Sequence, residues 1–160
     1  MEALVAVGLA SNVLQFVSFG ADLLSETRQI HSSVSGTTRE FEDIEGVCRH
    51  VEELCAGLSP APVPGSAPTK EEATLLSLAS KCRSAAQDLA ARLQTLRRRD
   101  AAPGSRTKLA SLRSALRANL GKRRVKELQR SLDGYRGELM ECLVGMLGSV
   151  PPSPVPVPGA

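Results

Sequence analysis

The feature that most restricts the fold of this chain is an N-terminal segment, residues 3–21, that contains no charged residue. Its polar residues recur at spacings of three and four from Ser11 to Gln29, which is typical of a narrow face on one continuous helix. Apolar residues occupy most of the remaining positions in its first half, and Gly36 supplies a C-terminal stop. We therefore expect a long apolar helix over residues 2–34.

Composition favours helices in the rest of the chain as well. Aromatic residues make up only 2% of the sequence, and tryptophan is absent. A core of leucine, valine and alanine suits helices, whereas strands favour β-branched and aromatic residues. At 160 residues the chain fits one domain with a single core. The sequence thus predicts an all-α fold, a bundle of about five helices.

Capping motifs indicate where the second and third helices begin. Thr37 precedes Glu40 by three residues, which is the spacing of a capping box, and predicts the start of the second helix. Thr69 and Glu72 repeat this spacing at the start of the third. Three consecutive arginines, residues 97–99, favour the C-terminal end of that helix because cations stabilise the negative end of the helix dipole.

Leucine spacing predicts the last two helices. Residues 109–120 carry four leucines on one face of a short fourth helix. Gly121 separates this helix from a fifth over residues 122–147, whose apolar positions follow a near-heptad spacing. Such spacing is expected of helices that pack at small angles.

Proline divides the chain into one domain, a loop and a tail. Residues 59–68 hold four prolines and predict an extended connector inserted within a helical bundle of residues 1–148. Residues 149–160 hold five prolines and are typical of a polyproline linker or disordered tail.

Charge is distributed unevenly along the sequence. Residues 1–58 contain three arginines and nine acidic residues, whereas residues 97–136 contain thirteen lysines and arginines and three acidic residues. This asymmetry favours either attraction between the two ends of the bundle or an anionic partner. We define the basic patch as Arg97, Arg98, Arg99, Arg106, Lys108, Lys122, Arg123, Arg124 and Lys126. Anionic lipid or protein is the expected partner, because the patch lacks the interleaved aromatic residues of nucleic-acid binders.

The sequence contains no motif typical of an enzyme. Gly121-Lys122 lacks the upstream glycine and the following Ser/Thr of a phosphate-binding loop. His31 and His50 are far apart and are expected to be surface or capping residues. The four cysteines form no CxxC pair and indicate reduced thiols in a cytoplasmic protein; they are Cys48, Cys55, Cys82 and Cys142. We therefore expect a non-enzymatic protein without a metal or cofactor.

The uncharged segment has two interpretations. Its nineteen residues would span roughly 28 Å as a helix, close to the ~30 Å hydrocarbon core of a bilayer. Asn12, Gln15 and the absence of flanking lysine or arginine argue against a permanent membrane span, and Glu2 argues against a signal peptide. We expect a core helix at rest that can insert into a membrane on activation. The residues expected to target the membrane are Leu4, Val5, Val7, Leu9, Val13, Leu14, Phe16, Val17 and Phe19.

Two parts of the sequence carry a family resemblance. The first is a small apolar start followed by Val-Leu-Gln-Phe-Val at residues 13–17, Phe19-Gly20 and Ser35-Gly36, and the second is the helix of residues 121–139. Both resemble the N-terminal domain of fungal STAND proteins, the HeLo-like group. The resemblance covers about residues 1–148. Two features depart from the family pattern: Leu120 replaces a common tryptophan, and the proline-rich loop is extra.

The resemblance implies a signalling role. It implies a helical effector domain of a fungal NLR-like innate-immunity receptor, cytoplasmic and conditionally at the plasma membrane. Such domains self-associate on activation, reach membranes through their N-terminal helix and trigger regulated cell death, as in heterokaryon incompatibility. A neighbouring nucleotide-binding domain is a further implied partner. The alternative is a cytosolic helical protein–protein interaction domain with no membrane activity.

Overall fold

The computed structural model describes residues 3–25, 31–34, 37–40, 44–59, 67–99 and 109–148. These residues form five helices and one two-stranded sheet, which are α1 (Ala3–Leu24), β1 (His31–Val34), β2 (Thr37–Glu40), α2 (Ile44–Gly57), α3 (Lys70–Arg99), α4 (Leu109–Leu120) and α5 (Lys122–Gly148). Most of the predicted proline-rich loop and all of the predicted tail lie outside the described residues.

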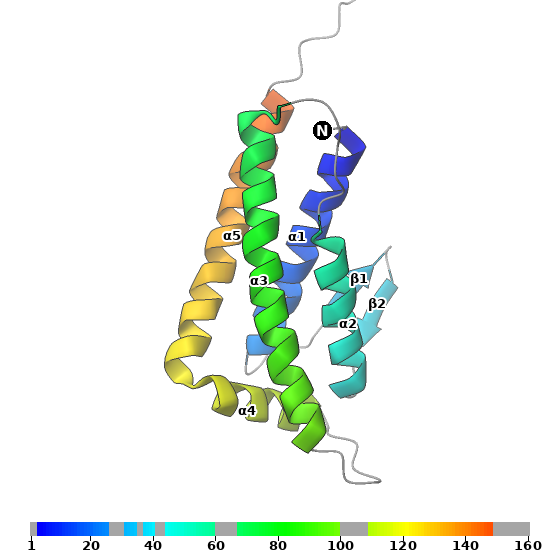
Figure 1. Cartoon of the computed structure of the whole chain (residues 1–160), viewed down its shortest axis with the longest axis vertical. Helices are drawn as coiled ribbons and strands as arrows, with labels where there is room; N and C mark the ends of the chain where they lie inside the picture. Colours follow the sequence, from blue (N-terminus) through cyan, green and yellow to red (C-terminus); the bar gives the residue numbers. More distant parts are fainter. Residues whose placement is uncertain are drawn as a thin grey trace, which may run out of the picture.

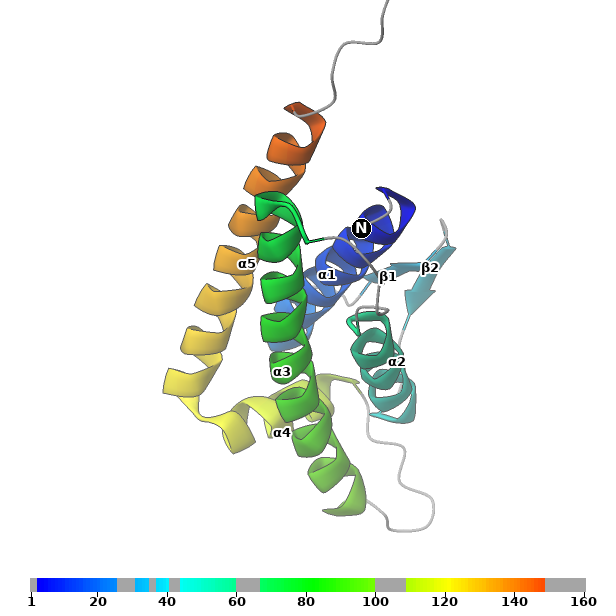
Figure 2. The same cartoon turned by 45° about the horizontal axis from the view of Figure 1, so that its top comes forward.

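The predicted all-α bundle is confirmed. Helices α1, α3 and α5 run alongside one another, α2 flanks α1 and α3, and α4 crosses the end of the bundle at which α3 ends and α5 begins (Figure 1). Figure 2 shows the same crossing of α4 from a second direction. Helix α1 contacts each of the other four helices, so the apolar N-terminal segment is the central element of the fold.

The core is aliphatic with two phenylalanines. Phe16 and Phe19 of α1 are each 1% exposed and lie among leucines and valines of the other helices. Each element contributes an apolar stripe because the sequence repeats its apolar residues every three or four positions. The largest fully buried side chains are Phe16, Phe19, Leu23, Leu24, Leu58, Leu75, Leu78, Leu93, Leu112, Leu116, Leu132 and Leu139.

The predicted course of residues 25–43 is wrong. Helix α1 ends at Leu24 instead of continuing to residue 34, and Thr37 and Glu40 belong to a strand instead of opening α2, which begins at Ile44. The two strands are antiparallel, with Val34 paired to Thr37 and His31 paired to Glu40.

Local chemistry explains the hairpin. The strand sequences His-Ser-Ser-Val and Thr-Thr-Arg-Glu contain the β-branched residues that favour strands. Pairing of Val34 with Thr37 leaves Ser35 and Gly36 between the strands, and glycine is favoured in two-residue hairpin connections. The Ser-Gly pair that suggested a helix stop lies outside the described residues.

The predicted start of α3 is confirmed in atomic detail. The Thr69 backbone N–H donates to Glu72 Oε2 at 2.8 Å, and the Glu72 backbone N–H donates to Thr69 Oγ1 at 3.2 Å. These reciprocal bonds satisfy donors that the first turn of a helix leaves without partners. The predicted separation of α4 from α5 is also confirmed, because Gly121 adopts a φ of +78° between them.

Candidate functional site

The structure divides the nine predicted membrane-targeting residues between two faces of α1. Leu9, Val13, Phe16, Val17 and Phe19 are buried. Three residues are exposed: Leu4 at 84%, Val7 at 64% and Leu14 at 38%, while Val5 is half-buried. The expectation of a core helix at rest is therefore only partly right. The open face of α1 is mostly apolar but includes Ser11 and the half-buried Gln15 and Ser18, and it carries no charged residue over residues 4–21.

The C-terminal end of α1 is held by side chains from α4 and α5. Arg113 Nη2 donates to the Asp22 carbonyl at 2.9 Å. Arg117 Nη1 donates to the Leu24 carbonyl, and Gln129 Nε2 donates to the same carbonyl at 3.3 Å. We name these three residues the α1 clamp. The cations also complement the negative end of the α1 dipole, since the last turn of α1 contains no basic residue.

Burial perturbs one member of the clamp. It lowers the pKa of the Arg113 guanidinium, while the nearby Asp22 carboxylate raises it. The guanidinium keeps its charge at neutral pH because an arginine starts from so high a pKa. The bond of Nη2 to the α1 backbone offsets part of the cost of burial, whereas the buried Nε has no hydrogen-bond partner among the described residues.

Two contacts join the middle of α1 to α2. Asn12 Nδ2 donates to the Gly57 carbonyl at 2.7 Å. The rings of Phe19 and His50 meet edge to face, with centroids 4.7 Å apart. His50 is only 3% exposed, so the prediction of a surface or capping histidine is wrong. It shares the α2 face of Val47 and Val51, which explains its burial.

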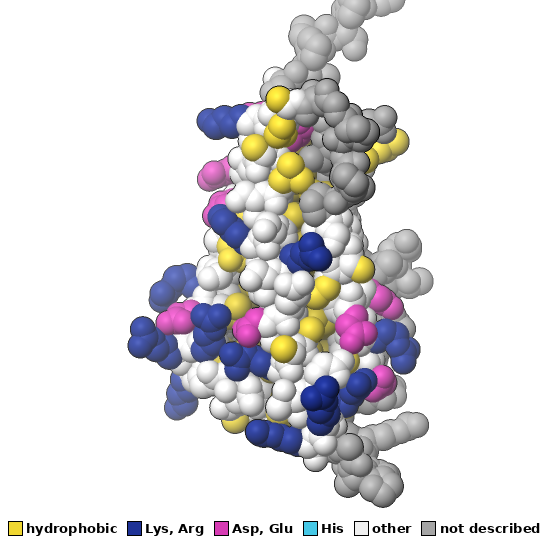
Figure 3. All heavy atoms as spheres, in the orientation of Figure 1, with side chains coloured by type: hydrophobic (Ala, Val, Ile, Leu, Met, Phe, Trp, Pro, Cys, Tyr) yellow, Lys and Arg dark blue, Asp and Glu magenta, His cyan; other side chains and the backbone are white. Residues whose placement is uncertain are grey.

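The basic patch lies at the α4 end of the bundle. Arg97, Arg98 and Arg99 end α3, and residues 122–126 begin α5; Figure 3 shows lysine and arginine side chains gathered over this end of the molecule. Arg106 and Lys108 lie outside the described residues. The structure thus brings together the described members of the patch at one end.

Some residues of the basic patch form ion pairs with acidic residues of the same molecule. Arg97 Nη1 lies 3.2 Å from a Glu45 carboxylate oxygen, which joins the basic end of α3 to acidic α2. Arg123 and Arg124 lie within 4 Å of Glu127, and Arg124 is also 3.9 Å from Asp88. These pairs are solvent-exposed and contribute at most about 1 kcal/mol each. Lys122 and Lys126 are exposed, and both project from the first turns of α5.

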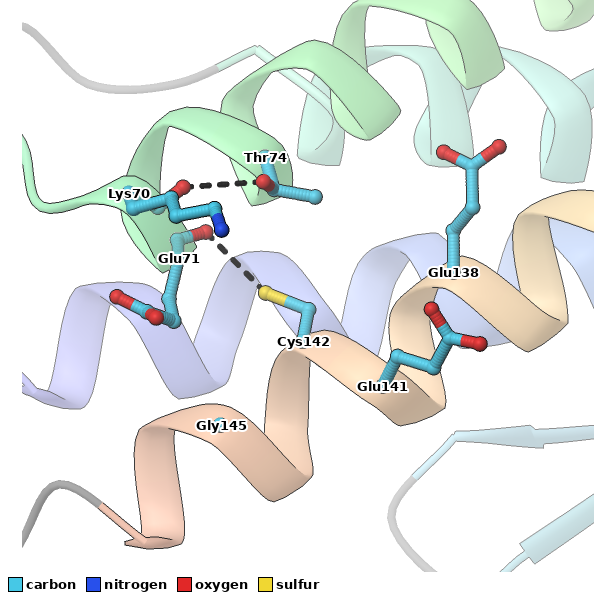
Figure 4. A pocket seen from close by; sticks show the side chains of 7 residues that line it. All are labelled: Lys70, Glu71, Thr74, Glu138, Glu141, Cys142 and Gly145. Carbon is cyan, nitrogen blue, oxygen red and sulfur yellow. Dashed lines mark hydrogen bonds between the residues drawn. The ribbon is translucent and has the colours of Figure 1, made fainter.

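A pocket of about 250 Å³ lies between the start of α3 and the end of α5 (Figure 4). Its lining residues are Lys70, Glu71, Thr74, Glu138, Glu141, Cys142 and Gly145. The Cys142 thiol donates to the Glu71 carbonyl at 3.2 Å. Figure 4 shows the side chains of Glu138 and Glu141 pointing away from the Cys142 sulfur. Burial, reinforced by Glu71, raises the pKa of Cys142. The thiol is therefore a structural donor and not an activated nucleophile.

The remaining cysteines are also structural in character. Burial raises the pKa of Cys48 and Cys55, and burial together with Glu138 raises the pKa of Cys82 to about 12. All four are free thiols. Within the described part of the chain, no group of three or more histidine, cysteine, aspartate or glutamate side chains is placed to hold a metal ion.

Sequence reasoning missed two groups of residues at this site. The first is the arginine pair of the α1 clamp, Arg113 and Arg117, which lie one turn apart beside the buried leucines of α4. The second is an exposed apolar group on α5: Met140 at 53%, Val144 at 66% and Leu147 at 74%. Their spacing of four and three places them on one helix face beside the buried stripe, which was a readable signal.

The fold and site define a helical bundle with one open apolar helix face and a basic patch at its α4 end. Comparison of the chain with protein-family models, with curated proteins and with solved structures finds no match.

Proposed function

We propose that this chain is a non-enzymatic effector and signalling domain that acts on membranes through α1. By resemblance, its context is the N-terminal position of a fungal STAND, or NLR-like, receptor that triggers regulated cell death when it oligomerises. The observation that carries the proposal is the state of α1: by length and composition Leu4–Leu24 could cross a membrane, and 44% of an 18-residue window within it is buried in the fold. Core helices of soluble proteins meet the same criterion but are mostly buried.

Burial energy determines how α1 can act. Seven large apolar side chains of α1 are buried: Leu9, Val13, Phe16, Val17, Phe19, Leu23 and Leu24. At about 1.5–3 kcal/mol each, their exposure to water would cost on the order of 10–20 kcal/mol. A domain is stable by only about 5–15 kcal/mol in total, so α1 cannot leave the bundle into water and spare the fold. Its insertion requires an apolar environment that receives the same side chains.

Expression in a filamentous fungal host tests the proposal. The chain is expressed alone and fused to an oligomerising partner, and cell viability and membrane association are measured. We expect the fused form to reach the plasma membrane and reduce viability. If neither form does so, the membrane-effector function is wrong.

A matched pair of variants makes this test specific to α1. Leu4→Asp/Val7→Asp places charges on exposed positions, so we expect the fold to be retained. The charges oppose insertion of α1, at a cost below the roughly 2.5–3.5 kcal/mol of a charge at the bilayer centre because both positions lie near one end of the span. The control, Ser77→Asp/Gln87→Asp, adds the same charge to exposed positions of α3. We expect only the α1 variant to abolish the effect on viability.

Burial of five of the nine predicted membrane-targeting residues favours a second candidate, a cytosolic protein–protein interaction domain. In that case α1 serves only as core, and the fused form stays in the soluble fraction while it still captures partner proteins. Fractionation of the fused form distinguishes the two functions directly.

A further inference from the structure

One face of α5 changes from basic to apolar along its length. We name it the α5 stripe, and its residues follow one another at spacings of three and four: Lys122, Lys126, Gln129, Asp133, Arg136, Met140, Val144 and Leu147. Apart from Gln129, which is half-buried, each of these residues is exposed. Three cations and one carboxylate occupy the first half, and three large apolar side chains end the stripe. Exposed apolar side chains that stand together, unlike single ones, mark interaction sites.

The α5 stripe runs beside the open face of α1. Gln129 contacts the carbonyl of Leu24, and Leu132 packs against Gly20, so the two helices are antiparallel and in contact. Figures 1 and 2 both show the end of α5 and the start of α1 at the same end of the bundle.

The antiparallel register places the apolar residues of the two helices at similar levels. Both helices rise about 1.5 Å per residue from the Gln129–Leu24 contact. Val144 then lies level with Leu9 and Leu147 with Ala6, so the exposed Val7 and Leu4 are each two residues, about 3 Å, farther along the axis. The exposed apolar residues of α1 and α5 therefore form one surface, which we name the composite face, at the end of the bundle opposite the basic patch.

We propose that the folded bundle docks on an anionic lipid bilayer through this composite face, with the apolar residues of α1 and α5 at the boundary of the acyl chains and Lys122 and Lys126 at the phosphates. This inference rests on the proposed membrane function and adds that α1 need not leave the bundle for the first contact. Apolar side chains at one end and lysines at the other match the apolar and anionic layers of such a membrane.

The charge pattern favours a membrane over a second copy of the chain. In a two-fold dimer with antiparallel stripes, Lys122 and Lys126 would face Val144 and Leu147. With parallel stripes, the lysines of one copy would face those of the other. Neither arrangement is complementary at both ends of the stripe, whereas an anionic bilayer suits the lysines and the apolar end, and only Asp133 opposes it.

Vesicle flotation tests the composite face. Binding is measured with vesicles of phosphatidylcholine and with an equal mixture of phosphatidylcholine and phosphatidylserine. We expect binding to the mixed vesicles to weaken about tenfold in Met140→Gln/Val144→Gln/Leu147→Gln and in Lys122→Glu/Lys126→Glu. The charge-matched control, Arg49→Glu/Arg83→Glu on α2 and α3, changes exposed residues that belong neither to the α5 stripe nor to the basic patch. An equal loss in the control would overturn the assignment to the stripe.

A disulfide that fastens α1 to α2 separates docking of the folded bundle from release of α1. A Cβ on Gly57 would lie 3.1 Å from Asn12 Cγ, which suits a disulfide in Asn12→Cys/Gly57→Cys. The half-buried Cys55 is replaced by alanine so that it does not compete, and peptide mapping verifies the new link. We expect the oxidised and reduced forms to bind mixed vesicles equally.

The outcomes of the two experiments are distinct. Binding only after reduction would show that α1 must be released, which overturns this inference and leaves the proposed function intact. Failure of the unmodified chain to bind either vesicle, alone or when fused to an oligomerising partner, would overturn both. A dimer that the α5 triple variant dissociates, with vesicle binding unchanged in that variant, would assign the apolar end of the stripe to a second copy and overturn the inference.

Discussion

Arg113 and Arg117 connect two parts of the sequence that lie about ninety residues apart, since each donates from α4 to a carbonyl in the last turn of α1. The last four carbonyls of any helix lack partners within the helix, and a partly buried carbonyl without a partner is costly. In this molecule Arg117 and Gln129 supply donors to the Leu24 carbonyl. Arg113 adds a charged donor to the Asp22 carbonyl, which also accepts the Ser25 backbone N–H at 3.3 Å.

Removal of one arginine of the α1 clamp should destabilise the fold. We expect Arg113→Ala and Arg117→Ala each to lower the free energy of unfolding by about 1–2 kcal/mol, because a carbonyl loses its charged donor. Urea denaturation measures the change, and Arg130→Ala, an exposed position on α5, is the control. Losses no larger than that of the control would show that water replaces the arginine donors at no cost.

The cysteines should differ in their reactivity. Cys82 is fully buried with a pKa of about 12, whereas Cys55 is half-buried. The raised pKa means that the folded state favours the protonated thiol, so Cys82 stays protonated and unreactive while the unfolded thiol ionises near pH 9. We expect iodoacetamide at pH 8 to modify Cys55 first and Cys82 last, as read by peptide mass spectrometry.

Unfolding provides the control for this experiment. In urea all four cysteines should react at similar rates, because burial no longer raises their pKa values. Modification of Cys82 in the folded chain as rapid as that of Cys55 would contradict the buried position of Cys82.

At the scale of elements, the junction of α4 and α5 depends on one backbone conformation. Gly121 has a φ of +78°, and a Cβ added there would meet no atom within 4 Å. Gly121→Ala should therefore cost about 1 kcal/mol through backbone strain alone. Gly134 lies inside α5 with equally open surroundings, and Gly134→Ala should stabilise the fold by about 0.5–1 kcal/mol because alanine favours helix.

The test is that the two substitutions change the free energy of unfolding in opposite directions. Thermal or urea unfolding of both variants measures them under the same conditions. A stabilising effect of Gly121→Ala would show that the junction adopts a different conformation in solution.

Elements that depend on local signals could be predicted, and those that depend on distant partners could not. The start of α3 follows from Thr69 and Glu72, which cap each other without help from the rest of the chain. The end of α1 does not follow from its own residues, because its polar face continues to Gln29. The helix ends at Leu24, where residues of α4 and α5 bind its carbonyls, and β-branched residues then form a hairpin.

The same distinction applies to the candidate site. The sequence identified the uncharged helix and the arginines that end α3, both of which are continuous features. It could not show which apolar residues of α1 are exposed, because that depends on where the other helices pack. The contribution of Met140, Val144 and Leu147 depends on the antiparallel register of α1 and α5, which is a tertiary property.

At the scale of the whole molecule, α1 is required for the fold. Deletion of residues 2–20 removes Phe16, Phe19 and most other core side chains of α1, the helix that contacts all four others. We expect the truncated chain to lose cooperative thermal unfolding and to bind a hydrophobic dye, because its core is left incomplete.

The Leu4→Asp/Val7→Asp variant is the control for the truncation, since it changes the same helix only at exposed positions. It should retain the circular dichroism spectrum and cooperative unfolding of the unmodified chain. A truncated chain that still unfolds cooperatively would mean that α2 to α5 form a core without α1.

The α1 clamp gives the central helix a direction. Three side chains fasten its C-terminal end, while Leu4 and Val7 at its N-terminal end contact solvent. Local opening of α1 should therefore begin at the N-terminus and proceed inward, first past the contact of Asn12 with Gly57 and then past that of Phe19 with His50. A small tilt of α1 about its clamped C-terminal end would therefore displace its N-terminal end the most.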